Sequence, residues 1–296
     1  MGVVPQFDIL WDQLTAMEHM RMFSKIKGVQ NEDIDEESEA LLDQVGLLDV
    51  KNAQCGTFSG GMKRRLSVAI SAIGNPRIIF FDEPTTGMDP VSRRNVWELM
   101  QSLKKDKTII LTTHAMEEAD VCILMIDATT GIESQDMSIF SKIIDRKKGV
   151  VLLVNKWDLM EKETNTARDY EIELKRKLAP MNDVPILFVS ALEKTRIFKA
   201  VEIALEVAEK RKQRIKTSAL NDWLEEALIK QSPPAYRGTL VKIKYVTQLP
   251  LYYPAFAFFC NYPDQLKGPY KNYLENRLRK TYDFKGVPIT LFFRKK

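Results

Sequence analysis

The stretch Val150-Val-Leu-Leu-Val-Asn-Lys-Trp-Asp158 decides the fold class of this chain. Its first five residues are all apolar, which is typical of a strand that is buried on both faces of a parallel sheet. Polar residues follow at once, so we expect the strand to end near Asn155. The stretch therefore predicts a buried parallel strand with polar side chains at its carboxyl end.

Similar apolar runs on both sides extend this strand into a sheet. Helical segments separate several of the runs, and this alternation is typical of an α/β domain with a parallel sheet. The predicted strands cover residues 77–82, 108–112, 121–126, 150–154 and 186–189, and the predicted helices cover about 91–103, 134–146 and 164–178.

The two ends of the chain follow other patterns. Residues 11–75 are predicted to be mostly helical, because apolar side chains recur there at helical spacing on either side of an acidic stretch. A long charged helix at about 195–214 precedes a different order of elements. That order predicts a separate small α+β domain with a helix at 219–230, strands at 239–247 and 255–261, a helix at 269–282 and a strand at 288–294.

Composition limits the class of protein. The 296 residues are 45% apolar and 28% charged, which is enough for two or three domains with cores of their own. No apolar run approaches the roughly 20 residues that a membrane helix needs, and the first residues do not resemble a secretory signal. The three cysteines form no Cys-x-x-Cys pair, which argues against a disulfide framework or a zinc site. We therefore expect a cytoplasmic protein without a transmembrane segment.

Charge is distributed unevenly along the chain. Residues 1–120 carry 13 Lys and Arg against 19 Asp and Glu, residues 121–214 carry 17 against 15, and residues 215–296 carry 14 against 6. The net +8 of the last segment favours a polyanion such as RNA as a partner, and a solvated basic face is the alternative. The candidate RNA contacts, which we expect to project partly outward, are Lys242, Lys244, Lys271, Arg277, Arg279 and Lys280.

Several short motifs are spaced along residues 1–120. A Ser-Gly-Gly stretch begins a helix, where free N–H groups and the helix dipole favour a phosphate, although most such stretches only cap a helix. An Asp-Glu pair ends an apolar strand, where the Asp can hold Mg²⁺ and the Glu can polarise water, although acidic strand ends are also common as caps. The whole set is Gln6, Ser59, Gly60, Gly61, Asp82, Glu83, Asp89 and His114.

This ordered set resembles the ATPase domain of ABC transporters, closest to the A-type subfamily with its Thr85-Thr-Gly-Met-Asp-Pro90 and Thr112-Thr-His-Ala-Met-Glu-Glu-Ala-Asp120. The resemblance implies ATP with Mg²⁺. The resemblance implies that Gln6 contacts metal and water and that Asp82 anchors Mg²⁺. It implies that Ser59, Gly60 and Gly61 contact the γ-phosphate and that His114 steadies it. It also implies that Glu83 is the general base and that Asp89 communicates across a dimer.

A second motif set follows two later strands. Asn155-Lys-Trp-Asp158 follows one strand, and Ser190-Ala191 follows the next. An Asp at a strand end can accept hydrogen bonds from guanine N1–H and N2–H, and a backbone N–H after the second strand can donate to O6. Two ordinary loops are the alternative. The candidate base contacts are Asn155, Lys156, Asp158, Ser190 and Ala191.

With Asp127-Ala-Thr-Thr-Gly131 upstream and Gly286-Val-Pro-Ile289 downstream, this half resembles the EngA (Der) family of ribosome-assembly GTPases. The resemblance covers the back of the second G domain and the KH-like domain of that family. It implies GTP with Mg²⁺ as the cofactor and ribosomal RNA or a ribosomal subunit as the partner.

Two features are missing from the sequence. Neither half contains the Gly-x-x-x-x-Gly-Lys-Ser/Thr loop of P-loop NTPases, and the KH-like part has no Gly-x-x-Gly.

We interpret the chain as a chimera of two NTPase fragments that meet near residue 120. The expected fold is α/β, with a partial P-loop NTPase sheet and a small α+β KH-like domain. The predicted domains are 1–120 (with a helical subdomain at 7–75 and strand motifs at 77–114), 121–214 and 215–296.

These features set the functional expectations. Phosphoryl transfer depends on positioning the phosphates, so we expect little or no intrinsic hydrolysis of ATP or GTP. RNA or ribosome association is the leading expectation. An ABC-type ATP-binding fragment that works with a second nucleotide-binding chain, and a fusion without function, are the alternatives. The strands at 108–112 and 121–126 would either pair through a tight crossover or belong to halves that stay separate.

Overall fold

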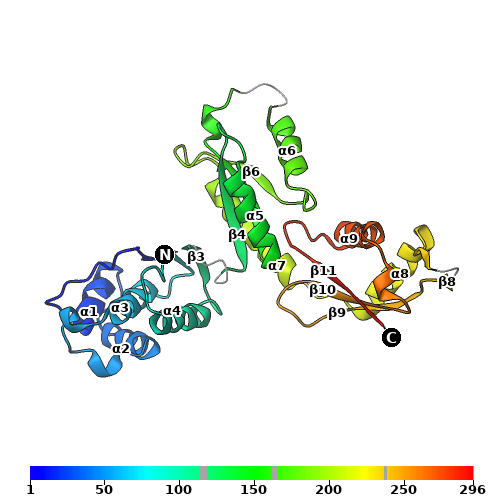
Figure 1. The fold of residues 1–296 in the computed structure, drawn as a ribbon. Coiled ribbons are helices and arrows are strands. Elements are labelled where there is room, and N and C mark those ends of the chain that lie inside the picture. Colours follow the sequence, from blue (N-terminus) through cyan, green and yellow to red (C-terminus); the bar gives the residue numbers. More distant parts are fainter. Residues whose placement is uncertain (114–118, 162–165, 237–238, 296) are drawn as a thin grey trace. The chain divides into compact units, whose positions relative to one another are not determined.

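The chain folds into two compact units, Met1–Glu118 and Ala119–Lys296 (Figure 1). The structure is a computed structural model, and it describes residues 1–113, 119–161, 166–236 and 239–295. Each unit contains its own three-stranded parallel sheet, which agrees with the expectation that the two halves stay separate. The mixed α/β architecture with an additional α+β part confirms the predicted fold class. The predicted domain boundaries after residues 120 and 214 stay predictions.

The first unit is a small sheet covered by helices. Its strand order is β1-β2-β3, all parallel. The strand β1 was not predicted, because three residues are too few to give a periodic signal. The elements are β1 (Gly2–Val4), α1 (Ala16–Ile26), α2 (Ile34–Gln44), two 3₁₀ turns (Leu48–Val50 and Cys55–Thr57), α3 (Gly60–Ala72), β2 (Ile78–Asp82), α4 (Pro90–Leu103) and β3 (Thr108–Thr112).

Local sequence explains where these helices begin. Thr15 caps α1 in a reciprocal capping box with Glu18. Asp89 caps α4 and is followed by proline at the first helical position, which suits the fixed φ of that residue. The helices bury apolar side chains such as Met20 and Leu66 against Phe81 of β2, and all three are at most 2% exposed.

The second unit begins with another parallel sheet, in the order β4-β5-β6. Asp127 at the end of β4 is in register with Asn155 at the end of β5, so the polar residues that follow these strands lie at one edge of the sheet. The elements are β4 (Val121–Asp127), α5 (Ser134–Asp145), β5 (Gly149–Asn155), a 3₁₀ turn (Trp157–Leu159), α6 (Thr166–Lys177), β6 (Ile186–Phe188) and α7 (Ile197–Lys212).

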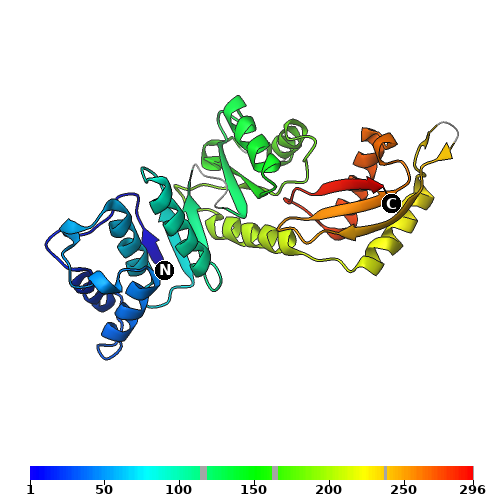
Figure 2. The same cartoon turned by 60° about the horizontal axis from the view of Figure 1, so that its bottom comes forward.

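The remainder of the second unit is a three-stranded mixed sheet in the order β11-β10-β9. The strand β10 pairs with β11 in parallel and with β9 antiparallel. Apolar side chains of α8 and α9 form one core with residues of this sheet, and α9 lies behind the strands in the view of Figure 2. The elements are α8 (Thr217–Lys230), the pair β7 (Ala235–Tyr236) and β8 (Thr239–Leu240), β9 (Ile243–Gln248), β10 (Ala255–Cys260), a 3₁₀ turn (Pro263–Gln265), α9 (Gly268–Tyr282) and β11 (Thr290–Lys295).

The two parts of the second unit share one hydrophobic core. Val151 and Val207 from the first part belong to the same buried cluster as Phe284 from the second. The Val150 N–H donates to the Gly286 carbonyl over 2.8 Å, which adds the loop after α9 to the start of β5. Gly286 has φ +76°, and a Cβ there would lie 2.8 Å from the Val150 oxygen, so both conformation and space require glycine. Among the described residues, no helix is long and apolar enough to cross a membrane.

Candidate functional site

The candidate base site lies at the carboxyl ends of β4, β5 and β6. The Ala191 N–H donates to Asn155 Oδ1 over 3.0 Å, and the Trp157 N–H donates to the Val189 carbonyl over 3.1 Å. These two bonds hold the loop after β5 against the loop after β6. The structure therefore brings the two predicted loops together, with Asn155 as the side chain that joins them.

Lys156 extends from this edge towards the end of β4. Its backbone is left-handed, with φ 60°, and its Nζ lies 2.6 Å from Asp127 Oδ2. The hydrogen bond from Lys156, together with those from Thr129, lowers the pKa of Asp127 to about 2. The same Asp127 carboxylate raises the pKa of Lys156. Both groups are therefore charged across the physiological pH range, and the lysine side chain is held across the strand ends.

Asp158 has one carboxylate oxygen that is open to a hydrogen-bond donor. It lies in the 3₁₀ turn after β5, where its Oδ1 is buried and has no hydrogen-bond partner within the described part of the chain. Buried polar atoms in folded proteins nearly always have a partner, and a carboxylate oxygen without one is unfavourable. The arrangement suits a ligand that donates N–H groups to this oxygen.

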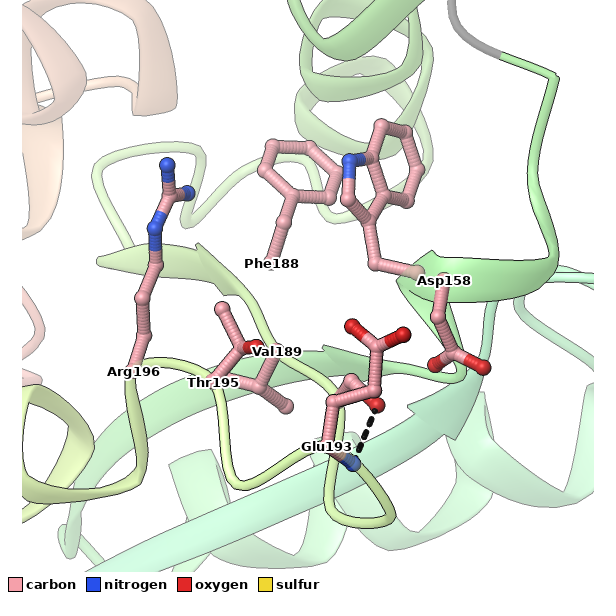
Figure 3. Close-up of a pocket in the computed structure, with 8 residues that line it drawn as sticks. Asp158, Phe188, Val189, Glu193, Thr195 and Arg196 are labelled. Atoms are coloured by element: carbon pink, nitrogen blue, oxygen red, sulfur yellow. Dashed lines mark hydrogen bonds between the residues drawn. The ribbon is translucent and has the colours of Figure 1, made fainter.

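A cavity of about 220 Å³ lies beside Asp158 (Figure 3). Two aromatic rings, Trp157 and Phe188, pack against each other along it with centroids 4.2 Å apart. The loop after β6 is closed by the Thr195 N–H, which donates to the Ser190 carbonyl over 2.9 Å, and by the Glu193 N–H, which donates to Ser190 Oγ over 3.1 Å. The cavity combines apolar walls with the carboxylates of Asp158 and Glu193, so it favours a flat ligand with N–H donors.

The strand-end residues of the first unit have partners within the protein. The Thr112 hydroxyl donates to Asp82 Oδ1, and the Thr86 hydroxyl donates to Glu83 Oε2 over 2.8 Å. Glu83 has φ +44°, a left-handed conformation that is uncommon for a residue with a side chain. Asp82 is a single exposed carboxylate, so it fits Mg²⁺ only together with ligand phosphates. In the described ranges, no cluster of three or more His, Cys, Asp and Glu could hold a metal.

The other predicted residues of this unit lie around the helix starts. Ser59 caps α3 by accepting the Met62 N–H over 3.3 Å, and a Cβ on Gly61 would meet Ser92 Oγ at 2.6 Å. Asp89 accepts the Val91 and Ser92 N–H groups, and the hydrogen bond from the Ser92 side chain, followed by these N–H groups, lowers the pKa of Asp89. Gly60 begins α3, Gln6 is exposed beyond β1, and His114 lies outside the described residues.

A buried arginine connects these motifs, and sequence reasoning missed it. Arg64 on α3 is only 2% exposed, and its guanidinium donates to backbone carbonyls at the ends of β1 and β2 and to one carboxylate. The run Lys63-Arg-Arg65 reads as a solvated basic surface, so the sequence contains no signal for this burial. The acceptors are the carbonyls of Pro5, Gln6, Asp82, Glu83 and Pro84 and Asp8 Oδ1.

The predicted RNA contacts divide into two groups. Lys242, Lys244 and Lys280 are exposed. Lys271 Nζ lies 5.1 Å from the centre of the Phe293 ring, and the side chain of Arg277 is 20% exposed with one nitrogen 3.9 Å from Glu226 Oε2.

The prediction that Arg279 projects outward is wrong. Its side chain is 13% exposed and donates to Asp183 Oδ2 and Glu275 Oε1, both over 3.0 Å, and to the Val287 carbonyl over 2.9 Å. These partners lie on α9, on the loop before β6 and on the loop before β11. Arg279 therefore connects the two parts of the second unit and is not available to a phosphate.

Three families of known proteins match successive parts of the chain. Residues 1–86 match the ABC transporter family, residues 109–228 match the GTP-binding domain of elongation factor Tu, and residues 214–294 match the C-terminal KH-domain-like domain of EngA bacterial GTPase enzymes. These matches confirm both predicted resemblances and agree with a chimeric sequence. The ABC match ends at residue 86, so the resemblance from there to His114 stays a prediction.

Several curated proteins named GTPase Der are similar to the chain. The protein from Christiangramia forsetii is 40% identical over 280 residues, which are 89% of this chain and 62% of the relative. The protein from Flavobacterium johnsoniae is 52% identical over 189 residues, or 64% of this chain and 43% of the relative. The protein from Amoebophilus asiaticus is 49% identical over 182 residues, or 62% and 42%. The chain thus spans less than two thirds of each of these relatives.

Proposed function

We propose that this chain is a cytoplasmic protein that binds ribosomal RNA, alone or within a ribosomal subunit, through residues 215–296. The observation that carries the proposal is that the segment with net +8 coincides with the match to the EngA KH-like domain at 214–294. Basic surfaces of this kind bind the phosphates of nucleic acids.

The exposed cations are the expected contacts. Lys242, Lys244 and Lys280 have exposed side chains, whereas Arg279 is occupied by carboxylates and carbonyls. Contacts of lysine with phosphate do not depend on base sequence. We therefore expect weak RNA binding that falls steeply with salt, with each neutralised phosphate adding about 0.7 to 0.9 to the slope of log affinity against log salt.

Salt titration of RNA binding tests this proposal. The double variant Lys242→Glu, Lys244→Glu should bind labelled RNA more weakly and with a shallower salt slope than the wild-type chain. The matched control reverses two exposed lysines of α7, Lys199→Glu and Lys212→Glu, and should leave the slope unchanged. No RNA binding by the wild-type chain at low salt would refute the proposal, as would equal effects of the two double variants.

We infer that the site at Asp158 is a guanine-recognition site that needs further contacts for measurable affinity. The supporting observation is the buried Asp158 Oδ1 without a partner among the described residues, beside the Asn155 and Ala191 pair. Two charge-assisted hydrogen bonds contribute about 3–6 kcal/mol, whereas immobilising a ligand costs about 4–15 kcal/mol. Phosphate contacts would have to supply the difference.

Calorimetry with GDP tests this inference. The chain should give no heat beyond dilution at millimolar GDP. Saturable binding that Asp158→Asn abolishes would show that the base site is sufficient by itself. Binding that survives Asp158→Asn would contradict the assignment of the site.

We also propose that the 296 residues do not turn over ATP or GTP by themselves, because they contain no Gly-x-x-x-x-Gly-Lys-Ser/Thr loop. Phosphate release from either nucleotide with Mg²⁺ should equal the background. A turnover that disappears in Glu83→Gln would contradict this proposal and would assign the activity to the first unit.

A second candidate function rests on the Arg64 network. Arg64 holds the chain next to Gln6, Asp82 and Glu83, so these residues keep fixed positions around α3. They could complete an ATP site on a second nucleotide-binding chain that supplies its own phosphate loop. Such a chain should associate with this one only in the presence of ATP and Mg²⁺, and Ser59→Arg should prevent that association. If neither this association nor RNA binding is found, the chain is a fusion without either function.

A further inference from the structure

One face of the β9–β10–β11 sheet carries aromatic side chains outside the hydrophobic core. In β10, Phe256 and Phe258 are completely buried in the core with α8 and α9, whereas the next residue in the alternation, Phe259, is half-buried and lies outside that core. Tyr245 and Arg294 are in register with Phe259 on the neighbouring strands. We call the surface formed by Tyr245, Thr247, Phe259, Phe292 and Arg294 the aromatic face.

A β-bulge adds one residue, Lys244, to the strand β9. Ile243 and Val246 both belong to the core, although regular alternation would turn residues three apart to opposite faces. The register shift between Phe259 and Cys260 resolves this conflict, because Tyr245 pairs with Phe259 while Ile243 pairs with Cys260. The intervening Lys244 is therefore exposed next to Tyr245.

Two rings of the aromatic face lie against each other, so each keeps only its outer face for a ligand. Tyr245 and Phe259 are stacked, with centroids 4.4 Å apart and planes at 14°. In the next row of the sheet, Thr247 and Phe292 flank Ala257, which is completely buried although it lies outside the core cluster. The larger neighbours thus cover the small residue, and the side chains of Thr247 and Phe292 stay half-buried.

Charge complementarity indicates the ligand. Lys242, Lys244 and Arg294 are exposed around the aromatic face, and β9, β10 and β11 contain no Asp or Glu. Aromatic rings with cations beside them bind single-stranded nucleic acids, because bases stack on the rings and phosphates meet the cations. A duplex keeps its bases stacked inside and offers only its phosphates to such a surface.

We propose that the aromatic face binds single-stranded RNA by stacking bases on Tyr245, Phe259 and Phe292, with Lys244 and Arg294 contacting the phosphates. This inference rests on the proposed RNA-binding function and assigns it to one face of the sheet. The helix side, with Arg277 and Lys280 on α9, would then contribute only electrostatic attraction. Base stacking on an aromatic ring changes affinity for a single strand by about 5- to 100-fold.

The test measures binding of the full chain to a labelled ten-nucleotide oligouridine and to a duplex RNA of equal charge, over a series of salt concentrations. Phe259→Leu and Tyr245→Leu should each weaken oligouridine binding about 5- to 100-fold, leave its salt slope unchanged and leave duplex binding unchanged. Tyr245→Phe keeps the ring and should bind as the wild type does. The matched control is Phe293→Leu, since Phe293 packs against Phe258 on the core side.

Each result separates the two proposals. If the wild type binds neither RNA nor ribosomal particles, the proposed function fails and the assignment of the face fails with it. If the wild type binds RNA but Phe259→Leu and Phe293→Leu behave alike, the assignment to the aromatic face is wrong while the proposed function stands. Loss of oligouridine binding in Arg277→Glu with retention in Phe259→Leu would place the site on α9 and would also overturn the assignment.

Discussion

The strand-end sites of the two units are built in opposite ways. In the first unit, Arg64 fills the space between the strand ends, and the carboxylates of Asp82 and Glu83 accept hydrogen bonds from threonine hydroxyls. In the second unit, two loops are tied together by Asn155, and Asp158 keeps a buried oxygen without a partner among the described residues. The carboxylates of the first site thus have partners within the protein, whereas the second site leaves a buried oxygen for the ligand that we propose.

Replacing the central side chain of the first site should have the largest effect. Arg64→Met removes all guanidinium donors and leaves the buried carbonyl acceptors unpaired, so the first unit should lose about 3–5 kcal/mol of unfolding free energy. Denaturant unfolding can follow the units separately, with Trp11 and Trp97 as probes of the first and Trp157 and Trp223 as probes of the second.

The neighbouring arginine is the control for this variant. Within the described residues, Arg65 donates only to the carbonyls of Val45 and Gly46, at a more exposed position, so Arg65→Met should cost about 1 kcal/mol. Equal losses for the two variants, or a loss of Arg64→Met that falls on the second unit, would show that Arg64 does not organise the first site.

Replacing the arginine of the second unit should have a smaller effect. Arg279→Met removes hydrogen bonds to Asp183, Glu275 and the Val287 carbonyl, and should cost the second unit about 2–3 kcal/mol. The exposed neighbour serves as the control, because Lys280→Met should stay within about 0.5 kcal/mol. If Arg279→Met changed RNA affinity without changing stability, the assignment of this residue to the interior would be wrong.

Removing the carboxylate of the proposed guanine site should change stability in the other direction. Asp158→Asn removes a carboxylate with a buried oxygen that lacks a partner among the described residues, so the unfolding free energy of the second unit should rise by about 0.5–1 kcal/mol. The same substitution at the exposed Asp169 should have no measurable effect. A lower unfolding free energy in Asp158→Asn would mean that the carboxylate has a structural partner and would contradict its assignment to a ligand site.

Acidification should affect the two units in different pH ranges. Burial lowers the pKa of His19, whose Nε2 accepts the Trp11 N–H over 2.9 Å. The unfolded chain then binds the proton more readily than the folded one, so stability is present above the ordinary histidine pKa of 6.5 and is lost as pH falls below it. In the second unit, Asp127 has a pKa of about 2, so its contribution is lost only between about pH 4 and pH 2.

Two substitutions test these pH ranges. His19→Gln should remove the loss of stability of the first unit below pH 6.5. Lys156→Met should raise the pKa of Asp127 in the folded chain towards 4, so the second unit should lose less stability on acidification and lose it nearer pH 4. A first unit whose stability stays constant from pH 7 to pH 4.5 would contradict the role of neutral His19.

The sequence predicted the elements whose pattern is local. The apolar runs at Val121 and Val150, and the helix after Asp89, appear as strands and a helix with ends that differ by a residue or two. The sequence also predicted that the loops after β5 and β6 lie together. Each loop carries one of the two motifs, and both loops follow neighbouring parallel strands. The predicted strand at 239–247 is interrupted and forms β8 and β9, since a continuous apolar pattern does not mark a break in pairing.

Features that depend on tertiary context were not predictable. Arg64 and Arg279 lie in charged runs that read as solvated, and only the folded chain shows the carbonyls and carboxylates that surround them. The β-bulge at Lys244 leaves no mark in the sequence, because the exposed lysine fits a regular strand equally well. The orphan oxygen of Asp158 is likewise a property of the packed loops and not of the motif.

Co-sedimentation with purified ribosomal particles tests the central claim most directly. The wild-type chain should sediment with the particles at low salt and leave them as salt is raised, whereas Lys242→Glu, Lys244→Glu should stay in the supernatant at a salt concentration at which the wild type is still bound. Identical sedimentation of the two proteins, or absence of the wild type from the particles at low salt, would contradict the claim that residues 215–296 bind ribosomal RNA.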